Sequence, residues 1–222
     1  MRTCSALAVL LAAFTLSACG KPQPAAPTSQ PAPAGATTAE PVPAALSTTT
    51  EIKRVDASGF TLGEYLPPLD GGKIEIAVPE GWKPAPRDSK YVVRFSSLAA
   101  GGGLPRIDVI VEEDKLGELT DLSEENVVEF TSAIAKHLDE AGTVVIEPPL
   151  PMIIGSVPCA RYVSNLKLNV GGGTIVVERQ TLALLHAGRL YKINLSVEVG
   201  KLLDSRDAAY AICSAIRFPV GE

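Results

Sequence analysis

Residues 159–197 read CARYVSNLKLNVGGGTIVVERQTLALLHAGRLYKINLSV, and this stretch decides the fold. Three β-rich segments, 159–168, 174–185 and 190–197, are separated by the short breaks VGGG and HAGR. In the last segment every second residue is apolar, so one face carries Tyr191, Ile193, Leu195 and Val197. Strands joined by such short breaks pair as antiparallel neighbours, so we predict a three-stranded meander.

Helices and shorter strands are predicted around this meander. Alternating or β-rich residues predict four further strands, at 73–78, 91–95, 106–111 and 143–147. Apolar residues at helical spacing predict a helix at about 123–140, capped by Ser123 or Asp121, and another at about 203–216. This order predicts an α+β fold, a single antiparallel β-sheet flanked by helices.

The N-terminus is typical of an exported lipoprotein. Arg2 precedes an uncharged apolar run, Ala6–Leu16, which is too short to span about 30 Å of hydrocarbon. Leu16-Ser17-Ala18-Cys19 resembles a bacterial lipobox, which implies cleavage before Cys19 and lipidation of its sulfur. A plain signal peptide that contains a cysteine is the alternative. Gly20 after the cysteine resembles the Gram-negative pattern sent to the outer membrane, facing the periplasm.

Residues 20–50 contain seven Pro, eight Ala and six Thr, and no aromatic residue. This composition buries too little apolar surface to fold, and frequent proline favours extended backbone. We interpret 19–50 as a lipidated cysteine with a disordered tether, and a Pro-rich docking ligand is the alternative. The predicted organisation is a signal peptide at 1–18, this tether, and a globular domain at 51–222.

Charge and motifs disfavour several functional classes. The chain has a net charge of −5, which disfavours binding to nucleic acid. His137 and His186 have no second histidine three or four residues away, so we predict no metal site. The sequence contains no nucleophile-elbow, P-loop or dinucleotide motif, so we predict no catalytic residue and no cofactor.

Two cysteines remain after Cys4 leaves with the signal peptide and Cys19 takes the lipid. Cys159 and Cys213 would then lie in an oxidising compartment. A disulfide between them would close a loop of about 54 residues and contribute roughly 4 kcal/mol in the chain-entropy account. Two separately buried thiols are the alternative.

Acidic side chains concentrate between residues 112 and 125, where seven carboxylates accompany a single lysine. Loops carry function more often than sheets do, so we select five of these acids as a candidate partner-binding patch: Glu112, Glu113, Asp114, Glu118 and Asp121. The segment lacks the spacing and the glycine of an EF-hand. A solvated loop and helix start is the alternative.

The two ends of the globular domain resemble those of PsbP-like domains. At the first end, a strand runs into Pro79-Glu80-Gly81-Trp82. At the other end, the C-terminal segment 212–218, ICSAIRF, is similar to the last helix of that family. The resemblance covers residues 70–219 and implies a PsbP-like α/β/α sandwich. The family includes the photosystem II subunit PsbP, a Ran-binding nuclear import factor and bacterial lipoproteins. Their functions share no chemistry, so the resemblance implies a non-catalytic binding or assembly role.

Three functional hypotheses follow from these observations. The first is a lipid-anchored envelope protein that binds a protein partner without catalysis. The alternative is a module that binds a small molecule or a lipid in the periplasm, in a cleft between helix and sheet. An enzyme is the weakest hypothesis, because no acid–base pair or nucleophile stands out. A deep pocket would favour the second hypothesis, and a flat acidic patch would favour the first.

Overall fold

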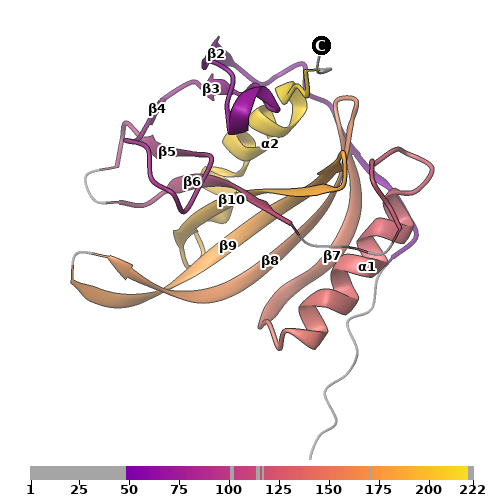
Figure 1. Cartoon of the computed structure of the whole chain (residues 1–222). Helices are drawn as coiled ribbons and strands as arrows, with labels where there is room; N and C mark the ends of the chain where they lie inside the picture. The colour runs from indigo at the N-terminus through magenta and orange to yellow at the C-terminus, as the bar shows by residue number, and fades with distance from the viewer. Residues whose placement is uncertain (1–48, 101–102, 114–115, 117, 171, 220–222) are drawn as a thin grey trace, which may run out of the picture. The chain divides into compact units, whose positions relative to one another are not determined.

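An eight-stranded sheet lies at the centre of the structure, with strand order β1-β7-β8-β9-β10-β6-β5-β4 (Figure 1). The structure is a computed structural model that describes residues 49–219 except 101–102, 114–115, 117 and 171. The strands of the sheet are β1 (Lys53–Val55), β4 (Trp82–Pro84), β5 (Val93–Ser97), β6 (Arg106–Glu112), β7 (Val145–Ile154), β8 (Val157–Val170), β9 (Gly173–His186) and β10 (Arg189–Glu198). A separate pair consists of β2 (Leu62–Tyr65) and β3 (Ala77–Pro79).

The predicted meander is confirmed as β8, β9 and β10. Residue 170 pairs with Gly173 at one end, and His186 pairs with Arg189 at the other. Ala187 and Gly188 both have positive φ, 48° and 68°, which is the backbone of a two-residue turn with the twist that a hairpin needs. All pairings in the large sheet are antiparallel except that of β1 with β7, so the sheet is mixed rather than purely antiparallel.

The two helices cover opposite faces of the sheet (Figure 1). One face packs against α2 (Arg206–Ala215) and contains Leu182, Ile193 and most of the buried apolar side chains. The other face packs against α1 (Val127–Glu140) through a smaller cluster that includes Phe130, Ala183 and Leu190. The sequence alternates accordingly, because successive residues of a strand point to opposite faces. The predicted α+β arrangement with helices on both faces is confirmed.

Several element boundaries differ from the prediction. Helix α1 begins at Val127 rather than 123, because the Asn126 side chain closes the preceding loop by accepting the Ser123 N–H (2.8 Å) and donating to the Asp121 carbonyl (3.0 Å). Neither Ser123 nor Asp121 is therefore the cap. Helix α2 begins at Arg206, after a short 3-10 turn at Leu202–Asp204.

The strand predicted at 143–147 extends to Ile154 and becomes β7. This strand contains three prolines, at positions 148, 149 and 151. They are tolerated because β1 pairs only with Met152–Ile154, which leaves the rest of that side of β7 without a hydrogen-bonded neighbour among the described strands. Of the strand predicted at 73–78, only Ala77 and Val78 lie in a strand, β3, although Ile74 and Ile76 are fully buried.

The attachment of α1 to the sheet generates a testable prediction. Phe130 is fully buried at the centre of the α1 cluster. We expect Phe130→Ala to lower the free energy of unfolding by about 3–4 kcal/mol in urea titrations of the full chain, since it leaves a cavity. Leu203, which is 71% exposed, provides a matched apolar control, and Leu203→Ala is expected to change the stability little. Equal losses in the two variants would contradict this packing.

Candidate functional site

The α1 side of the sheet is apolar under the helix and polar beyond it. Along β10, Leu190 packs in the α1 cluster, whereas the next residues on the same face are polar. Six buried polar residues share this face: Asp108, Ser164, Thr181, Lys192, Asn194 and Ser196. Burying a polar group costs stability unless it finds a partner, so a contiguous set of six is a candidate functional surface.

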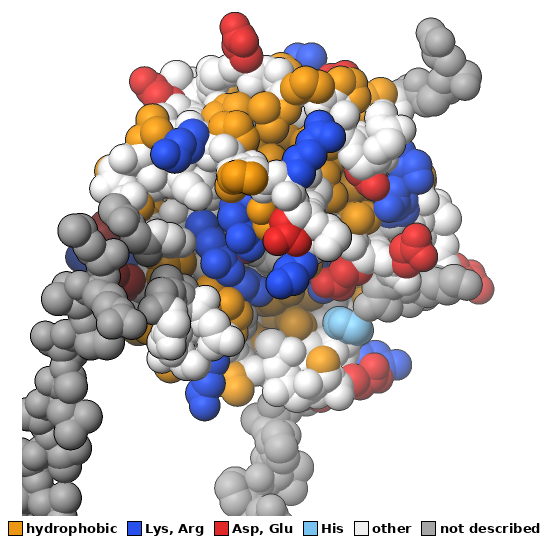
Figure 2. Space-filling view, turned by 60° about the vertical axis from the view of Figure 1, so that its left-hand side comes forward, with side chains coloured by type: hydrophobic (Ala, Val, Ile, Leu, Met, Phe, Trp, Pro, Cys, Tyr) orange, Lys and Arg blue, Asp and Glu red, His pale blue; other side chains and the backbone are white. Residues whose placement is uncertain are grey.

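Four cationic side chains on four adjacent strands lie on this part of the sheet, and we call it the basic face: Arg94 on β5, Arg106 on β6, Arg179 on β9 and Lys192 on β10. The face contains two carboxylates, Asp108 and Glu112, both from β6. Lys and Arg side chains accordingly gather in the middle of one face of the molecule, next to a hollow (Figure 2). This local excess of positive charge stands out in a chain with a net charge of −5.

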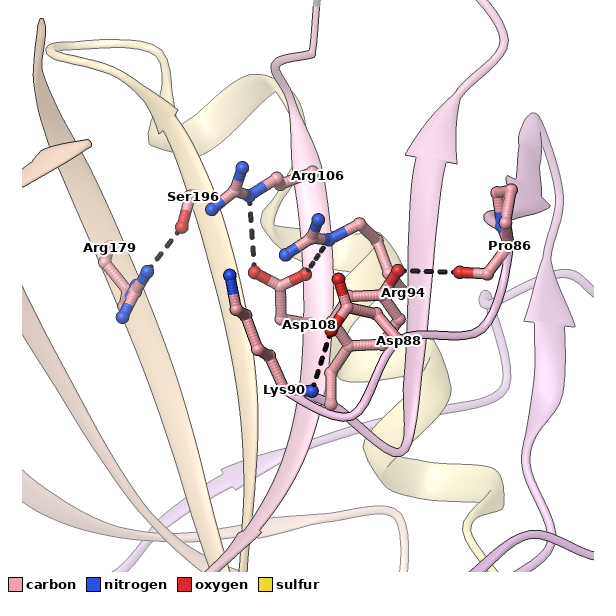
Figure 3. Close-up of polar contacts among 9 residues, drawn as sticks. Pro86, Asp88, Lys90, Arg94, Arg106, Asp108, Arg179 and Ser196 are labelled. Atoms are coloured by element: carbon pink, nitrogen blue, oxygen red, sulfur yellow. Dashed lines mark hydrogen bonds and ion pairs between the residues drawn. The ribbon is translucent and has the colours of Figure 1, made fainter. Parts of the chain in front are cut away.

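Asp108 holds two of the guanidinium groups (Figure 3). The Nε atom of Arg94 donates a hydrogen bond to Asp108 Oδ1, and Arg106 Nε lies 3.3 Å from Asp108 Oδ2. Burial lowers the pKa of Arg94, but the hydrogen bond and the charge of Asp108 outweigh that effect, and the pKa is raised overall. The Arg94 guanidinium also lies 4.3 Å from the centre of the Tyr91 ring. Asp108 thus fixes both arginine stems against the sheet.

The neighbouring polar residues on this face satisfy one another. Lys192 Nζ lies 2.5 Å from Glu112 Oε2, and the Thr181 hydroxyl donates to Asn194 Oδ1 at 2.8 Å. These pairs are neutral in sum. The excess positive charge therefore comes from the arginines.

Arg179 is the least compensated cation of the face. Its Nε atom donates to the Ser196 hydroxyl oxygen at 3.2 Å, and among the described residues no carboxylate lies within ion-pair distance of it. The pKa of Arg179 is lowered, first by burial and then by repulsion from Arg106 and Arg94, which together outweigh the attraction of Asp108. A partly buried guanidinium in this position would be stabilised by an anion.

A groove of about 230 Å³ opens between α1 and the basic face. Its lining includes the charged side chains of Arg179 and Lys192 and the apolar side chains of Leu138, Tyr162 and Leu166. A second hollow of about 400 Å³ lies between the β5–β6 connection and the segment after β10. Its charged lining residues, Glu198, Lys201 and Asp204, include a Lys201–Asp204 contact at 3.9 Å and leave no cluster of one sign, so the smaller groove is the stronger candidate.

The acids selected from the sequence have different surroundings. Glu112 belongs to the basic face as the partner of Lys192, and Glu113 is exposed. Asp121 holds the β9–β10 turn: its Oδ1 accepts the Ala187 N–H at 3.0 Å and lies 2.9 Å from His186 Nδ1. The Ala187 hydrogen bond in particular lowers the pKa of Asp121. Glu118 is exposed beside α1, and Asp114 lies outside the described residues.

The two remaining cysteines are brought together. Cys159 on β8 and Cys213 on α2 are fully buried free thiols, and a hydrogen bond between them, together with burial, raises the pKa of Cys213 well above its ordinary value. The structure thus provides the proximity that a disulfide requires, and the bond itself stays a prediction. Cys19 and the tether to residue 48 lie outside the described residues.

Within the described ranges, no three His, Cys, Asp or Glu side chains are grouped in a way that could hold a metal ion. No helix in that part of the chain is long and apolar enough to cross a membrane.

Sequence reasoning missed the basic face, although a signal for it was present. The prediction of the meander rests on the apolar side of its strands and draws nothing from the opposite side. That side carries Lys192, Asn194 and Ser196 on β10 and Arg179 and Thr181 on β9, which are polar residues at strictly alternating positions in central strands. A central strand with one polar face indicates that nothing apolar covers that face.

No family model and no curated protein match the chain. Among solved structures it is similar to a protein of Bacteroides thetaiotaomicron at 10% identity and a TM-score of 0.46, over 72% of this chain and only 50% of the other. It is also similar to CyanoP, the cyanobacterial PsbP of Synechocystis, at 13% identity and a TM-score of 0.38, over 68% of this chain and 89% of the other. LpqN, a Mycobacterium tuberculosis protein involved in cell envelope biogenesis, is similar at 16% identity and a TM-score of 0.42, over 66% and 83%. These likenesses concern the fold alone.

The uncompensated charge of Arg179 leads to a stability prediction. We expect Arg179→Gln to raise the free energy of unfolding by about 1 kcal/mol, because it removes a desolvated charge and leaves an amide that can still bond to Ser196. The matched control is Arg54→Gln, which removes an exposed arginine paired with Glu124, and little change is expected there. Urea unfolding of the full chain measures both, and a destabilised Arg179→Gln variant would show that the charge is compensated.

The cysteine pair leads to a second prediction for this part of the molecule. In protein isolated from an oxidising compartment, we expect a disulfide between Cys159 and Cys213, found as a linked peptide pair under non-reducing mass spectrometry. Reduction is then expected to lower the free energy of unfolding by about 4 kcal/mol. Two thiols that react with an alkylating reagent after unfolding, without prior reduction, would contradict the disulfide.

Proposed function

We propose that this chain is a lipid-anchored, non-catalytic protein of the bacterial cell envelope that binds a small anionic ligand in the groove between α1 and the basic face. The observation that carries the proposal is Arg179, a partly buried guanidinium that lines the groove and has no carboxylate partner among the described residues. Such a charge costs stability, and proteins tolerate a cost of this kind where function requires it.

The envelope location rests on the N-terminal sequence. Residues 1–18 have the pattern of a lipoprotein signal, Cys19 is the lipidation site, and Gly20 favours the outer membrane facing the periplasm. Acyl chains anchor a protein stably when two or more are present. The tether would then hold the domain away from the lipid surface.

A binding role fits the chemistry of the groove better than catalysis does. Its polar groups are the Arg179 guanidinium, the Lys192 ammonium paired with Glu112, the His137 imidazole, and hydroxyl and amide groups, of which Thr181 and Asn194 bond to each other. The Thr181 hydroxyl donates to Asn194 rather than to a basic side chain, so it lacks the activation that a nucleophile needs. These groups are donors suited to holding an anion in place.

A second candidate function is the binding of an acidic partner protein. It is favoured by the part of the basic face that lies outside the groove lining, which includes Arg94 and Arg106. Those arginines retain partial exposure, 27% and 17% of their side-chain surface, and a protein surface could reach them.

Photo-crosslinking in intact cells tests the proposal and separates the two candidates. A benzophenone amino acid replaces Leu166 in the groove lining of the full chain, and the same replacement of the exposed Leu203 is the control. We expect a small-molecule adduct at position 166 only, lost when Arg179→Gln is added. A protein adduct at position 166 would favour the second candidate. No adduct above the control, or one that Arg179→Gln leaves unchanged, would refute binding in the groove.

The anchor is tested in the same cells. Replacing Cys19 by Ser removes the acceptor of the lipid, so Cys19→Ser is expected to prevent acylation in mass spectra of the purified chain. An acylated Cys19→Ser chain, or an unmodified wild-type cysteine, would refute lipidation at this residue.

A further inference from the structure

The register of the sheet places serine and arginine alternately along one row of the basic face. Arg106 pairs with Ser196, and Ser196 pairs with Arg179 on its other side. The row continues outward to Ser96 and Ser164. Arginine thus stands on either side of a fully buried serine, and small side chains occupy the remaining positions.

This arrangement places guanidinium-bearing side chains on both sides of the fully buried Ser196. Strands two apart in a sheet are separated by roughly 10 Å, so the backbones of Arg106 and Arg179 lie about that far apart, one on each side of Ser196. Arg94 approaches from the next row, where it pairs with Asp108. Figure 3 shows the three arginines on the same side of the sheet, around Asp108 and Ser196.

The donors of these arginines are largely unused. Within the described part of the chain, the terminal nitrogens of Arg94, Arg106 and Arg179 form no hydrogen bond, and each side chain engages the protein through Nε. The Nε atom of Arg106 is buried and, although it lies 3.3 Å from Asp108, makes no hydrogen bond. The Ser196 oxygen accepts from Arg179 Nε, so the buried serine holds this side chain in place.

The charge balance defines the class of anion. Three guanidinium groups face Asp108. The loop beside them adds Asp88, which attracts Arg94, and Lys90, and the charges of these two cancel (Figure 3), while Lys192 and Glu112 neutralise each other. The remaining excess of two positive charges matches a phosphate monoester, which carries about −1.5 to −2 at neutral pH and three acceptor oxygens. A carboxylate supplies one charge and two oxygens in one plane, whereas three separate donors from three strands suit a tetrahedral group.

We infer that Arg94, Arg106 and Arg179, the last held in place by the buried Ser196, form a binding site for a phosphate group. This inference rests on the proposed function and specifies it. Of the site residues, Arg179 alone lines the groove, so the phosphate would lie beside Arg179 with the rest of the ligand in the groove. The apolar lining at Leu138, Tyr162 and Leu166 would contact the uncharged part of the same molecule. A soluble phosphate compound and a phospholipid headgroup share this chemistry, and the experiment separates them.

The test is calorimetric titration of the full chain in an uncharged detergent and a phosphate-free buffer. Three probes are used: inorganic phosphate, pyrophosphate and dihexanoyl phosphatidic acid, with succinate at equal ionic strength as the carboxylate control. We expect phosphate probes to bind at least about tenfold more tightly than succinate. Tighter binding of dihexanoyl phosphatidic acid than of either inorganic probe would identify a headgroup as the source. The reverse order would identify a soluble phosphate compound.

Variants assign the binding to these residues. Arg179→Gln and Arg106→Gln are each expected to weaken pyrophosphate binding about tenfold, because each removes charge-assisted donors. Arg54→Gln, at an exposed arginine paired with Glu124, is expected to bind pyrophosphate like the unchanged chain. Melting temperatures measured without ligand show that each variant is folded before its affinity is compared.

Several results would overturn the inference. They are the absence of binding by all phosphate probes, succinate binding as tight as phosphate, or affinities that both arginine variants leave unchanged. If the photo-adduct at position 166 is found while all phosphate probes fail, the phosphate inference fails and the proposed function stands. If neither the photo-adduct nor phosphate binding is found, the phosphate inference and the proposed function both fail.

Discussion

The alternation of side chains along β8, β9 and β10 is the constraint on which the rest of the structure depends. These strands lie in the middle of the large sheet, so each of their residues faces either α2 or the α1 side. The α2 side of β10 is lined by the hydrophobic cluster from Tyr191 to Val197. The α1 side is apolar only as far as the helix reaches, and beyond Leu190 it becomes polar. Helix α1 thus covers only part of this side of the sheet, and the remainder is a polar face that no described helix covers.

The open face explains why charged residues occupy central strands. Asp108 is nearly buried, and without Arg94 and Arg106 its charge would be costly. The same carboxylate cannot also serve Arg179, whose Nε is held by a serine instead. Because the strands fix the backbone of all four residues in register, the site is organised before any ligand arrives, which lowers the entropy cost of binding.

The sequence predicted the architecture well because its strongest signals are local. Short breaks between β-rich segments predicted the meander, and helical spacing predicted both helices. Prediction from the sequence failed where an element or a site depends on contacts with residues that are distant in the chain. The prolines of β7 are acceptable only because of where β1 ends, and the loop before α1 is closed by Asn126. The basic face is the clearest example, because Arg94, Arg106 and Arg179 are far apart in the chain and meet only through strand order. The acidic segment 112–125, in which the partner-binding patch was predicted, contributes Glu112 to this face as the counter-ion of Lys192.

The central claim is that the groove beside the basic face holds an anion in the cell. Native mass spectrometry of the full chain, extracted from its own membranes in an uncharged detergent, tests it most directly. The account predicts a bound species of constant mass that contains phosphorus and is absent from the Arg179→Gln chain prepared in the same way. A chain that carries no bound molecule in either preparation, or one that carries the same molecule in both, would contradict it.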